Sequence, residues 1–100
     1  MIASIQGTVA EKSADALVIA VNGIGYKVFA PHSTLEKSLL DGEVFLHTQL
    51  IVREDSLTLY GFVSTGERDL FATLLTISGV GPRVALSILS TMSIDNLRNA

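Results

Sequence analysis

The sequence contains no cysteine and no apolar run near the roughly 20 residues that a membrane-spanning helix needs. Without cysteine, the chain has neither a disulfide framework nor a zinc-ribbon site. Its first residues carry no basic stretch or cleavage site, so we expect no signal peptide. These absences are compatible with a reducing compartment, and we expect a cytoplasmic protein with no membrane partner.

Charged residues are also few, at 17% of the chain, and they give a formal net charge of −3. Proteins that bind nucleic acid through bulk positive charge have the opposite balance. The composition therefore argues against that mode of binding, but it permits a binder that uses backbone N–H groups and a few local cations. Hydrophobic residues make up 48% of the sequence, enough for a folded core rather than a disordered chain.

Motifs for catalysis and for cofactors are missing as well. His32 and His47 each stand alone, with no partner at a metal-ligand spacing. No serine lies in a nucleophile motif, and the phosphate-binding loop of ATPases is absent. We therefore expect a non-catalytic protein with no cofactor and no metal.

The first 63 residues show the turn signals and hydrophobic patterns of β structure. Asn22-Gly23 is the strongest hairpin signal in the chain. Residues 33–40 suit a short helix or turn, with Ser33 as its cap and Glu36 three residues on. Five strands with this interruption before the fourth indicate an OB-type barrel, with a small sandwich or an SH3-like barrel as alternatives. The expected strands cover residues 2–9, 16–21, 24–30, 43–53 and 57–63.

From Glu67 the hydrophobic period becomes helical, so we expect one domain at residues 1–63 and a second at residues 64–100. The fold class is then α+β, with the β part first. We expect helices at residues 67–78 and 82–91, and a third that opens at Ser93. Because the third has hardly begun at Ala100, the sequence suggests a fragment of a longer chain.

The link between the first two helices reads Ile-Ser-Gly-Val-Gly-Pro-Arg over residues 77–83. Gly79 can adopt the positive φ that ends a helix, and Pro82 suits the first turn of the next helix. A link this short folds the two helices back on each other. The pattern favours a helix-hairpin-helix that binds DNA, although a plain helical hairpin explains the same glycine and proline.

In the DNA-binding interpretation, the N–H groups around Val80, Gly81 and Arg83 point outward at the positive end of a helix dipole, where a phosphate binds well. Gly81 has no side chain, so a sugar-phosphate backbone can approach closely. Contacts of this kind position a protein on DNA but do not read its sequence.

Two further features of the β half allow more than one interpretation. Glu54 and Asp55 occupy the tip of an expected hairpin, where the simpler interpretation is a solvated turn and the sharper one is repulsion of phosphates. Five aromatic residues either form a stacking platform for single strands or, as we favour, pack in the core. They are Tyr26, Phe29, Phe45, Tyr60 and Phe62.

Several short motifs, in one register from Met1 to about Ala100, closely resemble the N-terminal half of the RuvA family of bacterial Holliday-junction-binding proteins. The resemblance implies an OB barrel followed by a helical domain with helix-hairpin-helix motifs. It also implies tetramers or paired tetramers that hold a four-way junction open, and a RuvB-type ATPase that binds through a C-terminal region absent here. The matching segments are Met1-Ile2 with Gly7, Gly23-Ile24-Gly25-Tyr26, Val52-Arg53-Glu54-Asp55, Leu59-Tyr60-Gly61-Phe62, Glu67-Arg68 with Leu70-Phe71, and Gly79-Val80-Gly81-Pro82 with Ala85 and Ile88-Leu89-Ser90.

The resemblance also implies roles for individual residues. Residues of the first hairpin would contact the DNA backbone, and Glu54 with Asp55 would form an acidic pin at the centre of a tetramer. The main rival is an oligomerising scaffold whose barrel binds protein and whose hairpin is structural; an OB single-strand binder is a third possibility. The implied DNA-binding residues are Gly79, Val80, Gly81, Pro82 and Arg83.

Overall fold

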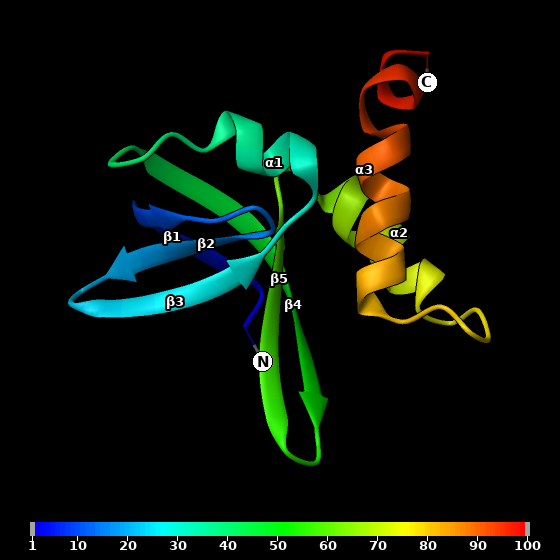
Figure 1. Cartoon of the computed structure of the whole chain (residues 1–100), viewed down its shortest axis with the longest axis horizontal. Helices are drawn as coiled ribbons and strands as arrows, with labels where there is room; N and C mark the ends of the chain where they lie inside the picture. The colour runs from blue at the N-terminus through cyan, green and yellow to red at the C-terminus, as the bar shows by residue number, and fades with distance from the viewer. Residues whose placement is uncertain (1, 100) are drawn as a thin grey trace.

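The computed structural model describes the backbone of residues 2–99 and the side chains of residues 2–91. Five strands come first, interrupted by one short helix, and two longer helices follow them (Figure 1). The elements in chain order are β1 (Ser4–Lys12), β2 (Ala16–Val21), β3 (Ile24–Phe29), α1 (His32–Lys37), β4 (Glu43–Arg53), β5 (Ser56–Phe62), α2 (Thr65–Leu74) and α3 (Pro82–Asn99).

The five strands form a closed barrel in the order β1-β2-β3-β5-β4. All neighbouring pairs are antiparallel except β3 with β5, which pair in parallel. A parallel pair needs a crossover, and here α1 and β4 supply it. This order and the helix between β3 and β4 confirm the expected OB-type barrel followed by helices, and with it the α+β class.

Turn chemistry sets two of the barrel's hairpins. Asn22 and Gly23 both have positive φ, at 51° and 85°, as the tightest hairpin turns require, so β2 and β3 pair with Val21 opposite Ile24. The β4–β5 hairpin has an equally short turn, because Arg53 pairs with Ser56. Both hairpins were expected from the sequence, and the second one places Glu54 and Asp55 at its tip.

The expected cap of the first short helix is wrong. Pro31, not Ser33, is the N-cap of α1, and no side chain caps it. Ser33 is buried inside the helix, with its hydroxyl left without a partner among the described residues. Pro31 has a φ of −66° and a ψ of 159°, so the chain is extended there and enters the helix without a side-chain cap.

The bounds of the longer helices also differ from expectation. Helix α2 runs from Thr65 to Leu74 rather than over residues 67–78, because Ser64 caps its N-terminus by accepting from the Glu67 N–H at 3.2 Å. No third helix opens at Ser93. Instead α3 continues without a break to Asn99, since neither glycine nor proline interrupts residues 83–99.

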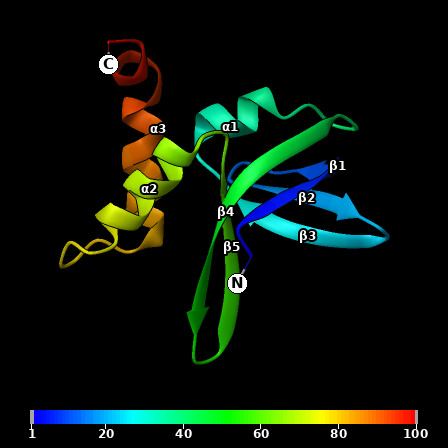
Figure 2. The same ribbon diagram turned by 180° about the vertical axis from the view of Figure 1, so that it is seen from behind.

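A second hydrophobic core joins the helices to the barrel. The Phe71 ring of α2 lies 5.0 Å from the rings of both Tyr60 and Phe62, which belong to β5. Phe62 and Phe71 are fully buried, and α3 adds Ala85, Leu86 and Leu89 to the same cluster. Helix α2 contacts α3 as well as β4 and β5, and Figure 2 shows it crossing in front of α3. The helix hairpin is therefore fixed relative to the barrel by packing.

A buried carboxyl group sits where the barrel passes into α2. Glu67 is only 4% exposed, and its Oε1 has no hydrogen-bond partner among the described residues. Burial raises the pKa of Glu67 above its ordinary value of 4.5, against the opposing effects of a Val63 backbone hydrogen bond and the Lys37 charge. The native state therefore holds this proton more firmly than the unfolded chain does.

We predict that replacing Glu67 by Gln increases the free energy of unfolding at pH 7 relative to wild type. Because the pKa of Glu67 is raised in the folded state, this residue contributes most to stability below pH 4.5. That stabilising contribution is lost as the pH rises through the folded-state pKa of Glu67. Glutamine keeps the capping pattern and carries no charge to desolvate. Urea unfolding from pH 4 to 7 measures the difference, which should shrink toward pH 4.

Glu36→Gln is the matched control, because the Glu36 side chain is 59% exposed. It should leave the pH dependence of unfolding nearly unchanged. A Glu67→Gln protein that is less stable than wild type at pH 7 would contradict the prediction.

Candidate nucleic-acid interface

The segment between α2 and α3 is a tight turn that reverses the chain. Gly79 has a φ of 86°, as expected for a residue that lets the chain leave a helix. The Val80 N–H donates to the Ile77 carbonyl at 3.1 Å, so the expectation that this N–H points freely outward is wrong. Val80 instead packs its partly buried side chain against the core shared by barrel and helices.

The turn leads directly into the N-terminus of α3. The Gly81 carbonyl accepts the first helical hydrogen bond, from the Ala85 N–H at 3.0 Å, which makes Gly81 the N-cap and Pro82 the first helical residue. The N–H groups of Gly81, Arg83 and Val84 therefore have no acceptor within the helix. These N–H groups lie at the positive end of a helix of 18 residues, where an anion is stabilised, and their binding of a phosphate stays a prediction.

Gly81 and Gly79 differ in whether the fold requires glycine at their positions. Its φ is not positive, and a Cβ atom built there meets nothing within 4 Å. No neighbour in the described chain and no backbone conformation requires glycine at Gly81, whereas the φ of Gly79 does. The missing side chain leaves the α3 N-terminus open to the outside.

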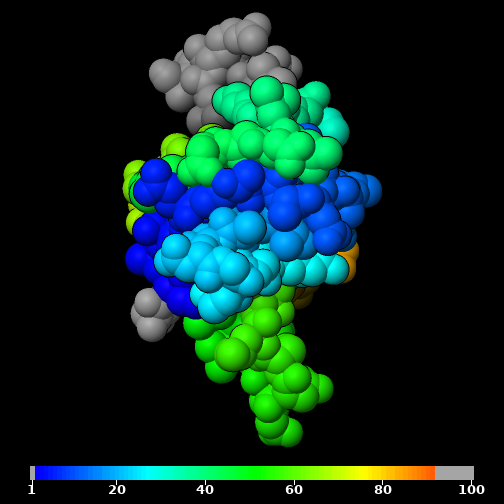
Figure 3. Space-filling model, turned by 90° about the vertical axis from the view of Figure 1, so that its left-hand side faces the viewer, coloured from blue at the N-terminus to red at the C-terminus, as the bar shows by residue number. Residues whose placement is uncertain are grey.

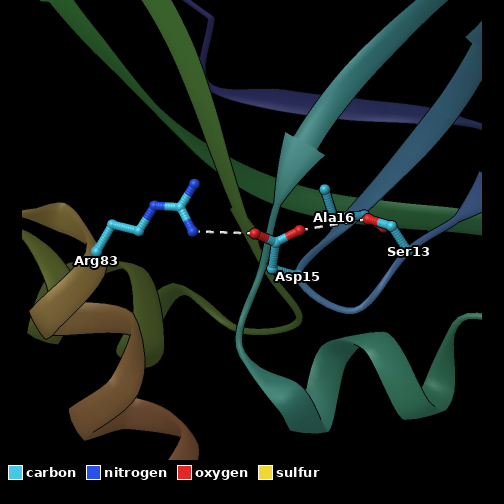
Figure 4. Close-up of polar contacts among 4 residues, drawn as sticks. All are labelled: Ser13, Asp15, Ala16 and Arg83. Atoms are coloured by element: carbon cyan, nitrogen blue, oxygen red, sulfur yellow. Dashed lines mark hydrogen bonds and ion pairs between the residues drawn. The ribbon is translucent and has the colours of Figure 1, made fainter.

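Arg83 does not extend freely from the turn. Its Nη1 donates to Oδ2 of Asp15 in the β1–β2 turn at 3.0 Å (Figure 4). Its Cζ also lies 5.3 Å from the centre of the Phe29 ring. Sequence reasoning missed Asp15, because nothing in the spacing of the two residues connects them.

A second cation lies against the same aromatic ring as Arg83. Lys27 Nζ lies 5.2 Å from the centre of the same Phe29 ring, and that ring packs 5.9 Å from Tyr60. Burial raises the pKa of Tyr60, while the positive charges of Arg83 and Arg53 oppose that rise. Lys27 and Arg83, which are far apart in the sequence, thus lie against the same ring.

The aromatic residues divide between core and surface. Tyr60 and Phe62 are buried, as the core interpretation expected, and Phe29 packs against the same cluster. Phe45 is 51% exposed and packs edge-on against His47. The five rings therefore do not form one continuous stacking platform.

Glu54 and Asp55 lie at the end of the β4–β5 hairpin, which projects well beyond the barrel (Figure 3). Both are exposed, and neither forms an ion pair or a side-chain hydrogen bond with any described residue. Val52 and Leu57 pair across the strands just behind them, yet they are 66% and 71% exposed. The tip is thus a negative end on an apolar, solvent-exposed stem.

The described residues offer neither a metal site nor a membrane-spanning helix. No group of three or more His, Asp or Glu side chains within residues 2–91 is arranged to hold a metal ion. Nor does the described part of the chain contain a helix with the length and apolar character to cross a membrane.

Comparison with known protein families matches both parts of the chain. Residues 1–61 match the model described as RuvA N terminal domain. The chain belongs to the RuvA family. Residues 71–100 match a second model, described as SAM-like Helix-hairpin-helix tandem, which covers the turn and α3. The RuvA-family resemblance seen in the sequence is thereby confirmed.

Curated relatives extend this match along the whole chain. Proteins named Holliday junction branch migration complex subunit RuvA are 49% identical in Beutenbergia cavernae and 48% identical in Chloroflexus aggregans, over 100 residues in each case. The protein of the same name in Pseudomonas fluorescens is 47% identical over 98 residues. These matches cover 97–100% of the chain but 48–51% of the relatives. The chain spans about half the length of these RuvA proteins.

We predict that serine destabilises the protein at one glycine of the turn and has little effect at the other. Gly79→Ser should lower the free energy of unfolding by about 1–2 kcal/mol, because a side chain is strained at positive φ. Gly81→Ser should change stability by less than about 0.5 kcal/mol, because the site is open and serine is a good N-cap. Equilibrium unfolding in urea compares the two. Equal losses would show that the fold itself requires glycine at both positions.

Proposed function

We propose that this protein is a DNA-binding subunit of a branch-migration complex, and that it grips the backbone of four-way junction DNA through its helix hairpin. The observation that carries the proposal is the open space around Gly81. The fold does not require glycine at this position, but the close approach of a sugar-phosphate backbone would require it. The relatives' printed name, and their identity along the whole chain, support the junction as the substrate.

The proposed contacts combine fixed geometry with little charge. Free N–H groups at the start of α3 would bind a phosphate, and Gly79 shapes the turn that aims them. Arg83 would add one charged contact. Because all of these contacts are to phosphates, the grip is independent of sequence, as a junction that moves along DNA requires.

We propose that Glu54 and Asp55 act as an acidic pin where the arms of the junction meet. Their unpaired carboxylates stand at the end of a projecting hairpin, so they can reach a DNA surface that the barrel does not touch. There they would repel phosphates and favour a junction with its strands held apart. Affinity for DNA would come from the helix hairpin, and selectivity for a four-way junction over duplex would come from the acidic pin.

We further propose that the protein assembles through its barrel domain at residues 1–63, as a tetramer or paired tetramers. Exposed apolar residues on the strands, among them Phe45, Val52 and Leu57, support burial against another copy. The subunit would carry no catalysis or cofactor of its own. A RuvB-type ATPase, contacted by a region outside this sequence, would supply the force in the bacterial cytoplasm.

The rival function is a scaffold whose hairpin serves only the fold. It differs from the proposal in what a side chain at Gly81 should do. Under the scaffold hypothesis the open surface at Gly81 faces only solvent, so its substitution has no effect on ligand binding. Binding of four-way, duplex and single-stranded DNA separates the two hypotheses and also tests a single-strand binder.

We predict that Gly81→Leu weakens binding to four-way junction and duplex DNA alike, by at least about tenfold. A leucine side chain would hold the phosphate away from the α3 N–H groups, and close contacts of this kind are lost over small distances. Gel-shift titration measures both affinities, with Gly81→Ser as the smaller control. Normal binding by a folded Gly81→Leu protein would favour the scaffold.

We predict the reverse sign for the acidic tip. Replacing Glu54 by Gln and Asp55 by Asn should leave DNA binding intact or tighten it, since a repulsive charge is removed. The gain should be larger for duplex than for junction, so the preference for junctions should shrink by a few-fold. Titrations of both DNAs at two salt concentrations measure the change. Weaker binding to both DNAs, with the fold intact, would contradict the pin assignment.

A further inference from the structure

The Arg83 side chain is held on the barrel side of the helix hairpin. Its ion pair with Asp15 joins residues 68 positions apart, and Ser13 Oγ donates to the other Asp15 carboxylate oxygen at 3.3 Å (Figure 4). The Phe29 ring lies beside the same guanidinium. Arg83, the cation that follows the turn between α2 and α3 directly, is therefore already paired with a carboxylate in the free protein.

This pairing matters because an arginine carboxylate contact and an arginine phosphate contact use the same donors. A phosphate that takes Nη1 of Arg83 must displace Asp15, and a phosphate that approaches another edge of the guanidinium still feels the negative charge beside it. Asp15 and Arg83 together line an open groove of about 360 Å³ between the β1–β2 turn and α3. DNA near the start of α3 would meet both charges together.

We propose that Asp15 competes with DNA phosphate for Arg83 and thereby limits the affinity of the helix hairpin for DNA. The proposal rests on the DNA-binding function proposed above and adds a residue of the barrel to its control. Asp15 does not itself contact DNA in this proposal. It acts through Arg83, by neutralising the charge that the hairpin would otherwise offer.

The alternative role for Asp15 is to orient Arg83 for a phosphate. Exposure decides between the two: the Arg83 side chain is 74% exposed and the Asp15 side chain 47%. An exposed ion pair holds its partners in place only weakly. The Asp15 carboxylate, in contrast, occupies the Nη1 donor of Arg83 and offsets the guanidinium charge, so a phosphate that binds Arg83 must displace it or share that donor. The electrostatic cost to DNA binding therefore exceeds the orienting benefit.

Four proteins test the competition: wild type, Asp15→Asn, Arg83→Ala and the double variant. Affinities for a duplex and for a four-way junction are measured across a range of salt concentrations. Asp15→Asn should tighten duplex binding roughly two- to fivefold, the size of an exposed ion pair. It should also steepen the slope of log affinity against log salt by up to about 0.9, as one freed cation would.

The double variant shows whether the effect passes through Arg83. Asp15→Asn should have little effect once Arg83 is alanine, and Arg83→Ala should cost more in the Asp15→Asn background than in wild type. Equal effects of Asp15→Asn in both backgrounds would overturn the proposal, because Asp15 would then act on DNA directly. Weaker binding with a shallower salt slope would also overturn it, and would assign Asp15 the orienting role.

Two control variants exclude simpler explanations. Asp41→Asn makes the same change in net charge on the α1–β4 segment, at a φ of 66° that asparagine adopts readily, and it should leave DNA affinity unchanged. Asp15→Glu keeps the charge but moves it by one methylene group, so it should raise DNA affinity less than Asp15→Asn does. A matching gain in Asp41→Asn would reduce the effect to net charge and overturn the competition.

The outcome for wild type separates this inference from the proposed function. If wild type binds DNA and Asp15→Asn binds no more tightly, the competition is wrong and the proposed function stands. If wild type binds neither duplex nor junction at low salt, the proposed function fails and the competition fails with it.

Discussion

The packing of Phe71 against Tyr60 and Phe62 is the contact on which the arrangement of this protein depends. Burying an aromatic side chain of this size typically stabilises a structure by about 2–3 kcal/mol. Here the two elements that share the contact are a barrel strand and the first helix of the hairpin. The direction of the hairpin is therefore set by the barrel, even though the hairpin's own turn is set locally.

The same strand that carries Tyr60 and Phe62 into this core also forms one side of the projecting hairpin. Strand β5 begins at Ser56, beside the acidic tip, and ends at Phe62, beneath α2. A paired strand is a stiff connection, so the tip and the helix hairpin keep a defined separation. A rigid subunit with a negative tip and a phosphate-binding turn suits the proposed grip on a junction, where both must meet DNA at once.

The positions of the charged residues matter more in this molecule than the net charge does. The net charge of −3 does not favour DNA, yet Lys27 and Arg83 lie against one aromatic ring near the start of α3. The Asp15 carboxylate pairs with Arg83 and offsets part of that positive charge. The acidic tip lies elsewhere, at the end of the β4–β5 hairpin. Backbone N–H groups add positive potential without adding formal charge. Under the proposed function, a hairpin built this way would hold DNA loosely enough for the strands to move.

Local sequence determined the features that depend on few neighbouring residues. The Asn22-Gly23 hairpin, the conformation of Gly79 and the helical start at Pro82 follow from backbone preferences that need no distant partner. The barrel class followed from the number and order of strands. The sequence also placed Glu54 and Asp55 at a hairpin tip, but only the family resemblance implied their role as a pin.

Tertiary structure alone decided which distant side chains meet. Asp15 pairs with Arg83 because barrel closure and the aromatic core bring the β1–β2 turn to the start of α3. The Val80 N–H is occupied because the chain tightens its turn to bury the Val80 side chain in that same core. Helical periodicity cannot foresee either contact, since each depends on the packing of two elements that the sequence separates. Spacing determines the conformation of a segment, but packing determines what that segment faces.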